Sequence, residues 1–397
     1  MRLINIHTLS FETVDQVKRQ TKAETVPYVI ISHRWLDDEV VFADMENDSA
    51  GFLKQCQDPS WSKAQSAAKL LGARDKAYAW STQRHRNEKN LPLVNHFWLD
   101  NVCINKTDTV ELSESINSMF RWYKEATVCF VYMNDCREGD MSLFGKSEWF
   151  QRGWTLQELV APEACEFYDR DWKYIGSRNT LSSEIAQRTS ISRHTLSLSS
   201  KSGMSKLSSE SVGHRMSWAA QRQTTKGEDL AYCLMGLFGV NMPALYGEGA
   251  ERAFRRLQEE ILKYSDDHSL FAWVDDKATD GGKSSGLLAP RPSCFHTTGK
   301  YAYGEALKNI DAHESEPYNL TNKGLSISLR MFQQGGDVYV ASLECLVDHE
   351  HCVGIFLRRI SERSNVYVRI YPQKLCKVKI GQQGNPQRIF VRQTLDF

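Results

Sequence analysis

Polar side chains that could do chemistry follow the ends of apolar runs. Asp100 follows one such run directly, and a helical pattern further along carries Trp154 and Glu158. In open parallel α/β sheets, ligands bind outside the carboxyl ends of the strands, where such loops converge. Several polar loops at one sheet edge therefore predict a site better than any one of them does. The group that follows the first apolar run is Ser32, His33, Arg34 and Trp35.

Glu158 has the most specific chemistry to offer. Trp154 and Glu158 are four residues apart, so on a helix they share one face, a single turn apart. Leu156 and Leu159 would supply the buried side of that helix, and Pro162 marks its end. Burial beside an indole could retune the pKa of such a carboxylate for catalysis. From the residues alone, a surface glutamate on an amphipathic helix remains the alternative.

The elements that must position these side chains are predicted by three apolar runs, at residues 28–31, 96–99 and 127–133. The runs are rich in β-branched or aromatic residues and do not alternate with polar ones, which is typical of strands buried on both faces of a parallel sheet. Residues 114–123 have the apolar spacing of a helix, and residues 60–89 predict another covering helix. Strand, helix and strand make a right-handed βαβ unit. We therefore expect a doubly wound, flavodoxin-like α/β fold with a parallel sheet and flanking helices.

Changes in composition and in the apolar pattern along the chain predict three domains or segments. Residues 1–175 would form the α/β domain, and residues 176–284 a serine-rich loop followed by a helical extension. In that extension, helices are expected at 229–238 and 249–264. Residues 285–397 contain short alternating segments separated by Gly and Asn, which predict a small C-terminal antiparallel β domain.

Composition narrows the class of protein. The 397 residues carry 49 Lys and Arg against 49 Asp and Glu, and this balance argues against a nucleic-acid partner. The apolar runs are far shorter than the roughly 18 residues of a membrane helix, and the first ten residues do not resemble a secretory signal. Ten cysteines are scattered without a regular framework, as in proteins with reduced thiols. We expect a cytoplasmic protein that has no membrane contact.

Two weaker signals favour ordinary structural roles. Cys345, His349, His351 and Cys352 have metal-ligand side chains, but their spacing matches no standard zinc pattern, so no metal site is expected. The glycines of residues 247–249 precede a helical pattern without the lysine and spacing of a phosphate-binding loop, which favours a turn or helix cap.

Parts of the sequence resemble the heterokaryon-incompatibility (HET) domain of filamentous fungi. The resemblance spans roughly residues 25–275 in order, and residues 153–159, Gly-Trp-Thr-Leu-Gln-Glu-Leu, are its most specific part. It implies a role in programmed cell death when genetically different hyphae fuse, a form of fungal innate immunity. The segments that carry it are residues 28–35, 97–105, 114–133, 153–162, 218–229 and 246–269.

HET domains are in turn similar to TIR domains, and the similarity can be followed here in order. Residues 30–34, Ile-Ile-Ser-His-Arg, resemble the end of the first TIR strand, and Asp100 stands where the second TIR strand ends. Residues 154–159 resemble the TIR helix Trp-Cys-Leu-x-Glu-Leu, with Thr155 in place of the cysteine. In catalytic TIR domains that glutamate is needed to cleave NAD. The resemblance thus implies that Glu158 is the catalytic residue of an NAD(P) glycohydrolase, with NAD or NADP as substrate and no bound cofactor.

The same resemblance implies binding roles for the other polar residues. Ser32, His33 and Arg34 would form the nucleotide-binding corner, in which Arg34 would pair with the diphosphate. Trp35 or Trp154 would stack on a base, and Asp100 would hold a ribose hydroxyl. The structural alternatives are a core position for Trp154 and an ion pair of Arg34 with Asp37 or Asp100. Many TIR domains have a small or basic residue where this chain has Trp35, so a different nucleotide pose is also open.

A second function is compatible with the same fold. TIR-type domains also act as non-catalytic signalling modules, which would trigger cell death by homotypic assembly, and fold alone does not choose between these roles. Both versions imply a homo-oligomer. The C-terminal β domain would bind, restrain or scaffold, with a regulatory protein as its conceivable partner.

Overall fold

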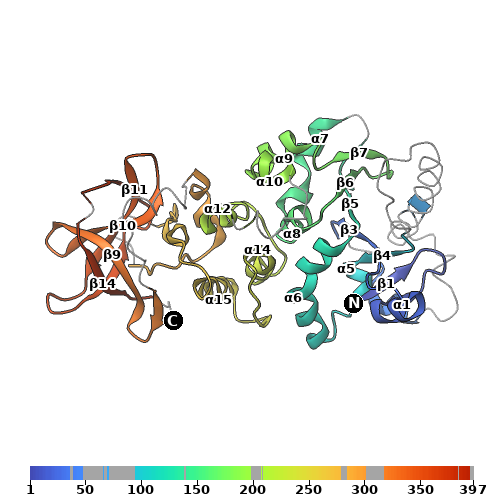
Figure 1. Cartoon of the computed structure of the whole chain (residues 1–397), viewed down its shortest axis with the longest axis horizontal. Coiled ribbons are helices and arrows are strands. Elements are labelled where there is room, and N and C mark those ends of the chain that lie inside the picture. The colour runs from blue at the N-terminus through green and yellow to red at the C-terminus, as the bar shows by residue number, and fades with distance from the viewer. Residues whose placement is uncertain are drawn as a thin grey trace. The chain divides into compact units, whose positions relative to one another are not determined.

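The computed structural model describes residues 1–35, 39–47, 66, 69–70, 94–137, 140–197, 207, 209–278, 284–300, 317–382 and 384–393. The chain divides into two compact units, Met1–Gly203 and Met204–Phe397 (Figure 1). The predicted helix at 60–89 falls almost entirely outside the described residues. No helix in the described ranges is long and apolar enough to cross a membrane.

A mixed sheet of seven strands forms the centre of the first unit, in the order β2-β1-β4-β3-β5-β6-β7 (Figure 1). The four central strands are mutually parallel, whereas β1, β2 and β7 pair antiparallel at the two edges. Across the sheet the parallel strands follow one another as β4, β3, β5 and β6, so the second of them in the chain comes first and the first lies between the second and the third. The α/β fold is thus confirmed, but the sheet is parallel only at its centre, and the antiparallel edges were not predicted. The strands are β1 (Arg2–Asn5), β2 (Phe11–Thr13), β3 (Val29–His33), β4 (His96–Leu99), β5 (Val128–Tyr132), β6 (Cys165–Tyr168) and β7 (Tyr174–Ser177).

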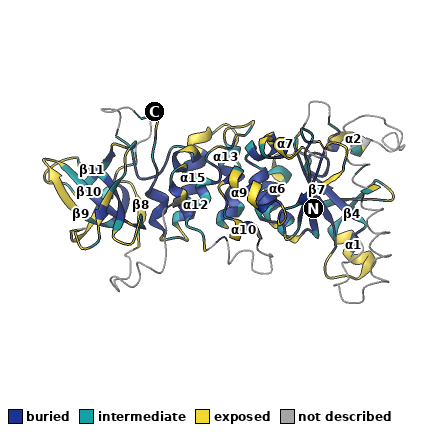
Figure 2. Cartoon of the chain, turned by 90° about the horizontal axis from the view of Figure 1, so that it is seen from above, coloured by how far each residue is buried: buried dark blue, intermediate teal, exposed yellow. Residues whose placement is uncertain are grey.

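Strands β3 and β4 are buried on both faces, as their unbroken apolar runs predicted (Figure 2). Every residue of β3 and β4 is buried, including the polar Ser32 and His33 at the end of β3. The helices of this unit are α1 (Val14–Thr21), α2 (Phe42–Asn47), α5 (Asp100–Cys103), α6 (Thr109–Glu125), α7 (Met141–Lys146), α8 (Thr155–Val160), α9 (Ser182–Thr189) and α10 (Arg193–Ser197), with the 3-10 turn η1 (Glu148–Gln151).

Helix α6 forms where its apolar spacing predicted. Asp108 caps its first turn by accepting hydrogen bonds from the backbone of Val110 and Glu111, which satisfies two of the free amides of a helix N-terminus. Its buried face includes Ile116, Met119 and Tyr123. The ring of Tyr123 meets Trp98 of β4 edge to face, with centroids 6.0 Å apart, so α6 is seated on the sheet. Helix α8 packs against α6 on that face.

The first unit extends past the predicted boundary at residue 175. That position lies inside β7, whose Tyr174 and Ser177 pair with β6, and helices α9 and α10 follow within the same unit. The serine-rich stretch that was predicted as a loop begins with these two helices. The residues of the stretch beyond them, at 198–206, lie outside the described ranges.

The second unit begins with short helices. The predicted helix at 229–238 forms as two pieces, and the one at 249–264 forms as α15. Its apolar residues Phe254, Leu257 and Ile261 are buried, as their spacing predicted. The helices are α12 (Val212–Ser217), α13 (Asp229–Tyr232), α14 (Met235–Phe238) and α15 (Ala250–Leu262), with the 3-10 turns η3 (His268–Phe271), η4 (Pro292–Phe295) and η5 (Thr298–Lys300).

A second sheet completes this unit, in the order β10-β11-β12-β14-β9-β8. An additional pairing of β10 with β9 closes β9, β10, β11, β12 and β14 into a ring, and β13 pairs with β11. The C-terminal β-sheet is confirmed, but β12 and β14 are parallel, so the sheet is not wholly antiparallel. The strands are β8 (Asn319–Thr321), β9 (Gly324–Gly335), β10 (Val338–Leu346), β11 (His351–Arg359), β12 (Val366–Ile370), β13 (Cys376–Lys379) and β14 (Pro386–Val391).

A buried arginine joins the helical part of the second unit to its sheet. Arg369 of β12 is 0% exposed and donates to the backbone carbonyls of Phe271 and Trp273, at 3.0 and 2.7 Å. Its guanidinium also lies 3.8 Å from the centroid of the Trp273 ring. These contacts cross the boundary that the sequence suggested at residues 284 and 285, which explains why the extension and the sheet form one compact unit.

Candidate active site

The end of β3 presents two polar side chains to opposite faces of the sheet. Ser32 and His33 are consecutive in a strand, so their side chains point in opposite directions. Ser32 meets Glu158 of α8 on one side, and His33 meets Glu39 and Asp100 on the other. The carboxyl end of β3 is therefore the point at which the predicted residues converge.

Glu158 is a buried carboxylate, with only 8% of its surface exposed. The Ser32 hydroxyl donates a hydrogen bond to its Oε2 atom, and Trp149 Nε1 donates to Ser32 Oγ at 2.8 Å. Burial raises the pKa of Glu158 to about 7, although the Ser32 hydrogen bond opposes the rise. The interpretation of Glu158 as a solvent-exposed surface residue is thus wrong.

His33 and Asp100 form a charged pair on the other side of the end of β3, from which both groups act electrostatically on Glu158. His33 Nε2 lies 3.3 Å from Asp100 Oδ1, and His33 Nδ1 lies 3.4 Å from Glu39 Oε2. Burial alone would lower the pKa of His33, but the neighbouring carboxylates of Asp100 and Glu39 outweigh it and raise the pKa to about 9. The pKa of Asp100 is lowered, because Lys106 and His33 outweigh its burial. At neutral pH the pair is therefore an imidazolium and a carboxylate.

Trp35 lies at the open side of the pair. Its indole Nε1 donates to both oxygens of Asp100, at 3.2 and 3.0 Å, while 42% of the residue is exposed. The Lys106 ammonium lies 3.2 Å from the centroid of a Trp35 ring and 3.6 Å from Asp100 Oδ2. A base that stacks on this face of Trp35 would have to displace Lys106.

Arg34 and Trp154 are less closely tied to the corner. Arg34 forms an ion pair with Glu148 near the surface, rather than with Asp100, and Asp37 lies outside the described residues. Trp154 is half-buried and directly precedes α8 with helical backbone angles, φ −61° and ψ −35°. The binding roles expected of both residues stay predictions.

Sequence reasoning missed Glu39, Lys106, Tyr123 and Trp149 as part of this site. The pKa of Tyr123 is raised well above its usual value, first by burial and then by the nearby Glu158. Trp149 is 1% exposed and reads from sequence as an ordinary core residue. The available signal was its position nine residues before Glu158.

The arrangement combines a carboxylate whose charge changes near neutral pH with an imidazolium–carboxylate pair. Such a carboxylate can stabilise positive charge on a substrate once it is ionised. Within the described ranges, no group of three or more His, Cys, Asp or Glu side chains is arranged to hold a metal ion.

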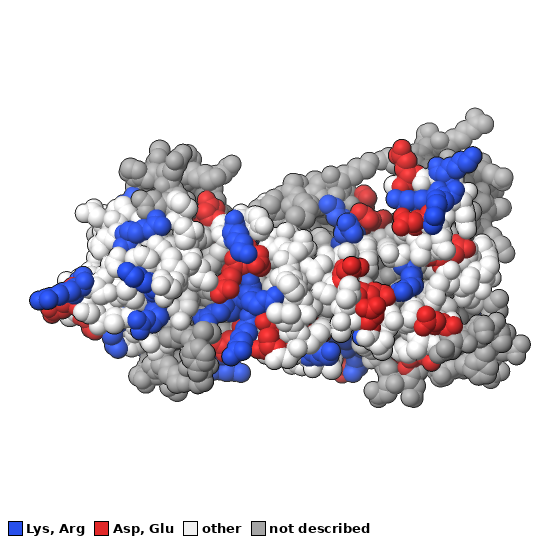
Figure 3. All heavy atoms as spheres, turned by 90° about the horizontal axis from the view of Figure 1, so that it is seen from below, with Lys and Arg blue, Asp and Glu red and all other residues white. Residues whose placement is uncertain are grey.

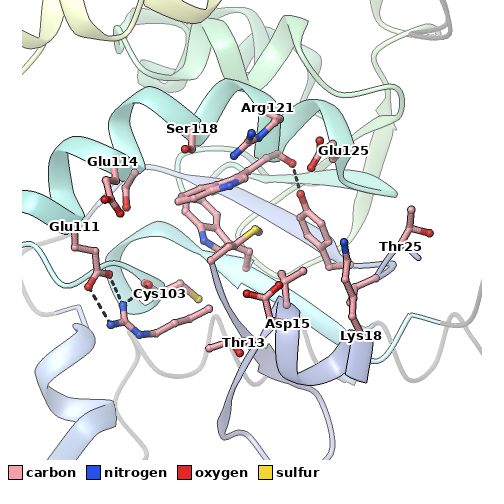
Figure 4. Close-up of a pocket in the computed structure, with 18 residues that line it drawn as sticks. Thr13, Asp15, Lys18, Thr25, Cys103, Glu111, Glu114, Ser118, Arg121 and Glu125 are labelled. Carbon is pink, nitrogen blue, oxygen red and sulfur yellow. Dashed lines mark hydrogen bonds and ion pairs between the residues drawn. The ribbon is translucent and has the colours of Figure 1, made fainter. Parts of the chain in front are cut away.

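A large cavity of about 870 Å³ lies elsewhere in the first unit, between α1, β1 and α6 (Figure 4). Its lining includes Tyr28 at the start of β3 and Trp98, together with the charged residues Lys18, Glu114 and Arg121. None of the predicted site residues lines it.

On the face drawn in Figure 3, acidic and basic side chains of the described residues are interspersed.

Comparisons with known proteins agree with the resemblance. The family model described as "Heterokaryon incompatibility protein (HET)" matches residues 28–145, and a domain of unknown function, DUF8212, matches residues 252–286. The vegetative incompatibility protein HET-E-1 of Podospora anserina is 39% identical over 271 residues, which make up 64% of this chain and 17% of that protein. The chain thus corresponds to a small part of that relative. No solved structure matches.

Only part of the candidate site lies inside the segment that the heterokaryon incompatibility family model matches. Ser32, His33, Arg34, Trp35 and Asp100 lie inside the matched segment, which stops before η1 and α8. Residues 28–145 of this chain, less than a third of it, are therefore similar to the heterokaryon incompatibility family, and they carry the His33–Asp100 half of the site.

Proposed function

We propose that this chain is an NAD(P) glycohydrolase that releases nicotinamide and acts as a cell-death effector in heterokaryon incompatibility. Glu158 is its catalytic carboxylate. The observation that carries the proposal is the burial of Glu158 against Ser32 at the carboxyl end of β3, which brings its pKa to about 7. A buried carboxylate whose pKa is shifted toward neutrality is typical of functional sites.

The chemistry suits one carboxylate. The bond between the ribose C1′ and the nicotinamide nitrogen breaks, and its electron pair stays with nicotinamide, which leaves as a neutral base. Positive charge then develops on the ribose, as in glycoside hydrolysis, and an ionised Glu158 would stabilise it. Water adds to C1′ and loses a proton, which completes the hydrolysis.

The fold supports a TIR-like or flavodoxin-like assignment of the first unit. Its parallel strands stand in the order second, first, third, fourth, which agrees with the flavodoxin-like order. Ligands of that fold bind at the switch point beside the first strand, here the end of β3. Ser32, His33, Arg34, Trp35, Asp100 and Trp154 would line the nucleotide site, and NAD or NADP is the substrate rather than a resident cofactor.

The similarity to a vegetative incompatibility protein also supports a second candidate function, a non-catalytic module that triggers cell death by homotypic assembly. The large exposed side chains of Trp35 and Val41, 42% and 44% exposed, would offer apolar contacts to a second copy. Both versions include a homo-oligomer.

The test is nicotinamide release by the purified full chain, with NAD and NADP supplied separately, over a range of protein concentrations. We expect release that increases per molecule as the chain assembles, and its loss in Glu158→Ala. The same variant expressed in cells separates the two functions. Unimpaired killing by a folded Glu158→Ala protein would assign the effect to assembly instead of chemistry.

A further inference from the structure

Trp149 begins a buried chain of hydrogen bonds that ends on Glu158. Trp149 Nε1 donates to Ser32 Oγ at 2.8 Å, and the Ser32 hydroxyl donates to Glu158 Oε2. Trp149 and Ser32 are each 1% exposed. Water therefore has little access to the middle of this chain, and each donor must find its partner within the protein.

The direction of the chain follows from what each group can do. An indole N–H only donates, a hydroxyl has one hydrogen, and an ionised carboxylate only accepts. Donation from Trp149 fills one lone pair of Ser32 Oγ and strengthens that hydroxyl as a donor to Glu158. Without it, the Ser32 oxygen would be freer to accept a hydrogen bond from a protonated Glu158, so the chain would run in the opposite direction.

Hydrogen bonds to the backbone amide and carbonyl of Trp149, together with the packing of its ring, fix the position of this residue. Ser147 caps η1 by accepting from the Trp149 amide at 3.2 Å, and the Ser147 hydroxyl donates to Asp135 at 2.7 Å. Thr155 of α8 donates to the Trp149 carbonyl at 2.6 Å. The Trp149 ring packs edge to face on Phe167 of β6, with centroids 5.7 Å apart. The donor is thus fixed relative to β6 and to the first turn of the helix that carries Glu158.

We propose that Trp149 is a positioning residue for Glu158. Its indole N–H orients the Ser32 hydroxyl toward the carboxylate and so favours the ionised form that the proposed reaction uses. The catalytic consequence rests on the proposed function, whereas the effect on the ionisation of Glu158 does not.

The test measures the ionisation of Glu158 by carboxyl ¹³C NMR in the full-length protein and in Trp149→Phe, which removes the indole donor but keeps an aromatic ring. We expect the pKa of Glu158, about 7 in the native chain, to rise by about 1 unit. The other groups that act on it, His33, Asp100, Arg152 and Tyr123, are the same in both proteins. At pH 7 the proposed nicotinamide release should then fall about fivefold, with recovery near pH 9.

Two controls separate orientation from loosened packing. Phe150→Leu, a loss of the ring whose centroid lies 5.1 Å from that of Trp149, should leave the pKa of Glu158 unchanged. In a Ser32→Ala background, Trp149→Phe should have no further effect, because the chain runs through Ser32. An unchanged pKa in Trp149→Phe, or an equal rise in the Ser32→Ala background, would overturn the inference.

A second measurement needs no change at Trp149. In the native protein, the indole ¹H–¹⁵N resonance of Trp149 should shift with the same midpoint as the Glu158 carboxyl, and Ser32→Ala should abolish that shift. An indole resonance that ignores the titration of Glu158 contradicts the proposal. Absence of nicotinamide release from the native chain would refute the proposed function and leave the NMR result to decide the role of Trp149.

Discussion

At the scale of single residues, the site is defined by the raised pKa values of two groups, Glu158 and His33, that meet at the end of β3. Burial raises the pKa of Glu158 toward neutrality, whereas two carboxylates overcome the burial of His33 and keep it protonated. Strongly shifted pKa values in a buried cluster are typical of functional sites. The charge of Glu158 should therefore affect both stability and chemistry.

Glu158→Gln should make the first unit more stable at pH 8 than the native protein. The pKa of Glu158 is raised from 4.5 to about 7 on folding, so its contribution to stability is present below pH 4.5 and is lost as the pH rises through about 7. Glutamine cannot ionise and escapes this loss, a difference of about 3 kcal/mol. Urea unfolding at pH 4.5 and pH 8 measures it. If the free energy of unfolding differs between Glu158→Gln and the native protein by the same amount at both pH values, the result contradicts a buried carboxylate with a raised pKa.

Asp100→Asn should lower the pKa of His33 from about 9, because one of its two carboxylate partners is lost. The expected drop is at least about 1 unit, measured by NMR titration of the His33 ring. Glu148→Gln removes a carboxylate that pairs with Arg34 instead, and it should leave His33 unchanged. Equal effects of the two substitutions would argue against the His33–Asp100 pair.

At the scale of elements, the catalytic proposal depends on where α8 is held. Arg178, just after β7 and 4% exposed, donates to the carbonyls of Leu159 and Glu163 at 2.6 and 2.9 Å. The bond to Leu159 satisfies a carbonyl at the C-terminal end of α8 that the helix itself leaves free, and the bond to Glu163 holds the segment that follows the helix. The orientation of Glu158 thus depends on a contact outside its own helix.

Arg178→Met should destabilise the first unit by about 2 kcal/mol, because the buried carbonyl of Leu159 loses its charged donor. It should also weaken nicotinamide release, since α8 can then shift relative to Ser32. Arg193→Met, on the exposed side of α10, is the matched control and should change stability by no more than about 0.5 kcal/mol. Denaturant unfolding of both variants measures the difference in stability. Equal losses of stability would contradict the role of Arg178 in holding α8.

The sequence predicted those elements whose burial is complete. The runs at 28–31, 96–99 and 127–133 became β3, β4 and β5, because a strand buried on both faces must be apolar throughout. The short strands β1, β2, β6 and β7 were missed. Asn5, Glu12 and Glu166 interrupt the apolar pattern of the first three.

The same limit applies to the site. Ser32 and Glu158 were predicted to lie together because Ser32 follows a strand at the carboxyl edge of the sheet and Glu158 was placed on a helix beside that edge. Trp149 and Lys106 were not predicted, because only tertiary packing brings an apparent core tryptophan and a loop lysine to these carboxylates.

At the scale of the whole molecule, the chain consists of two units with separate cores. All residues of the candidate site lie in the first, whereas the segment similar to DUF8212 lies in the second. The Arg369 contacts to Phe271 and Trp273 explain why that segment belongs with the C-terminal sheet. The stability of each unit should therefore respond to its own substitutions.

Arg369→Met should lower the unfolding temperature of the second unit without changing that of the first. The expected loss is about 3 kcal/mol, because two buried carbonyls lose a charged donor and the Trp273 ring loses its cation. Arg358→Met, which removes a half-exposed arginine on β11, is the matched control with little expected effect. Scanning calorimetry of the full chain resolves the outcome. A shift of the first unit's transition would mean that the two units do not unfold independently.

The central claim, that Glu158 cleaves the nicotinamide bond, is tested most directly by the rate of nicotinamide release from NAD at pH 8 in three full-length proteins. They are the native chain, Glu158→Gln, and the control Glu163→Gln, which changes an exposed glutamate five residues away. The account predicts that Glu158→Gln loses at least about 100-fold in rate, while Glu163→Gln matches the native chain. Equal rates for the native chain and a folded Glu158→Gln, or no release from the native chain under assembling conditions, would contradict it.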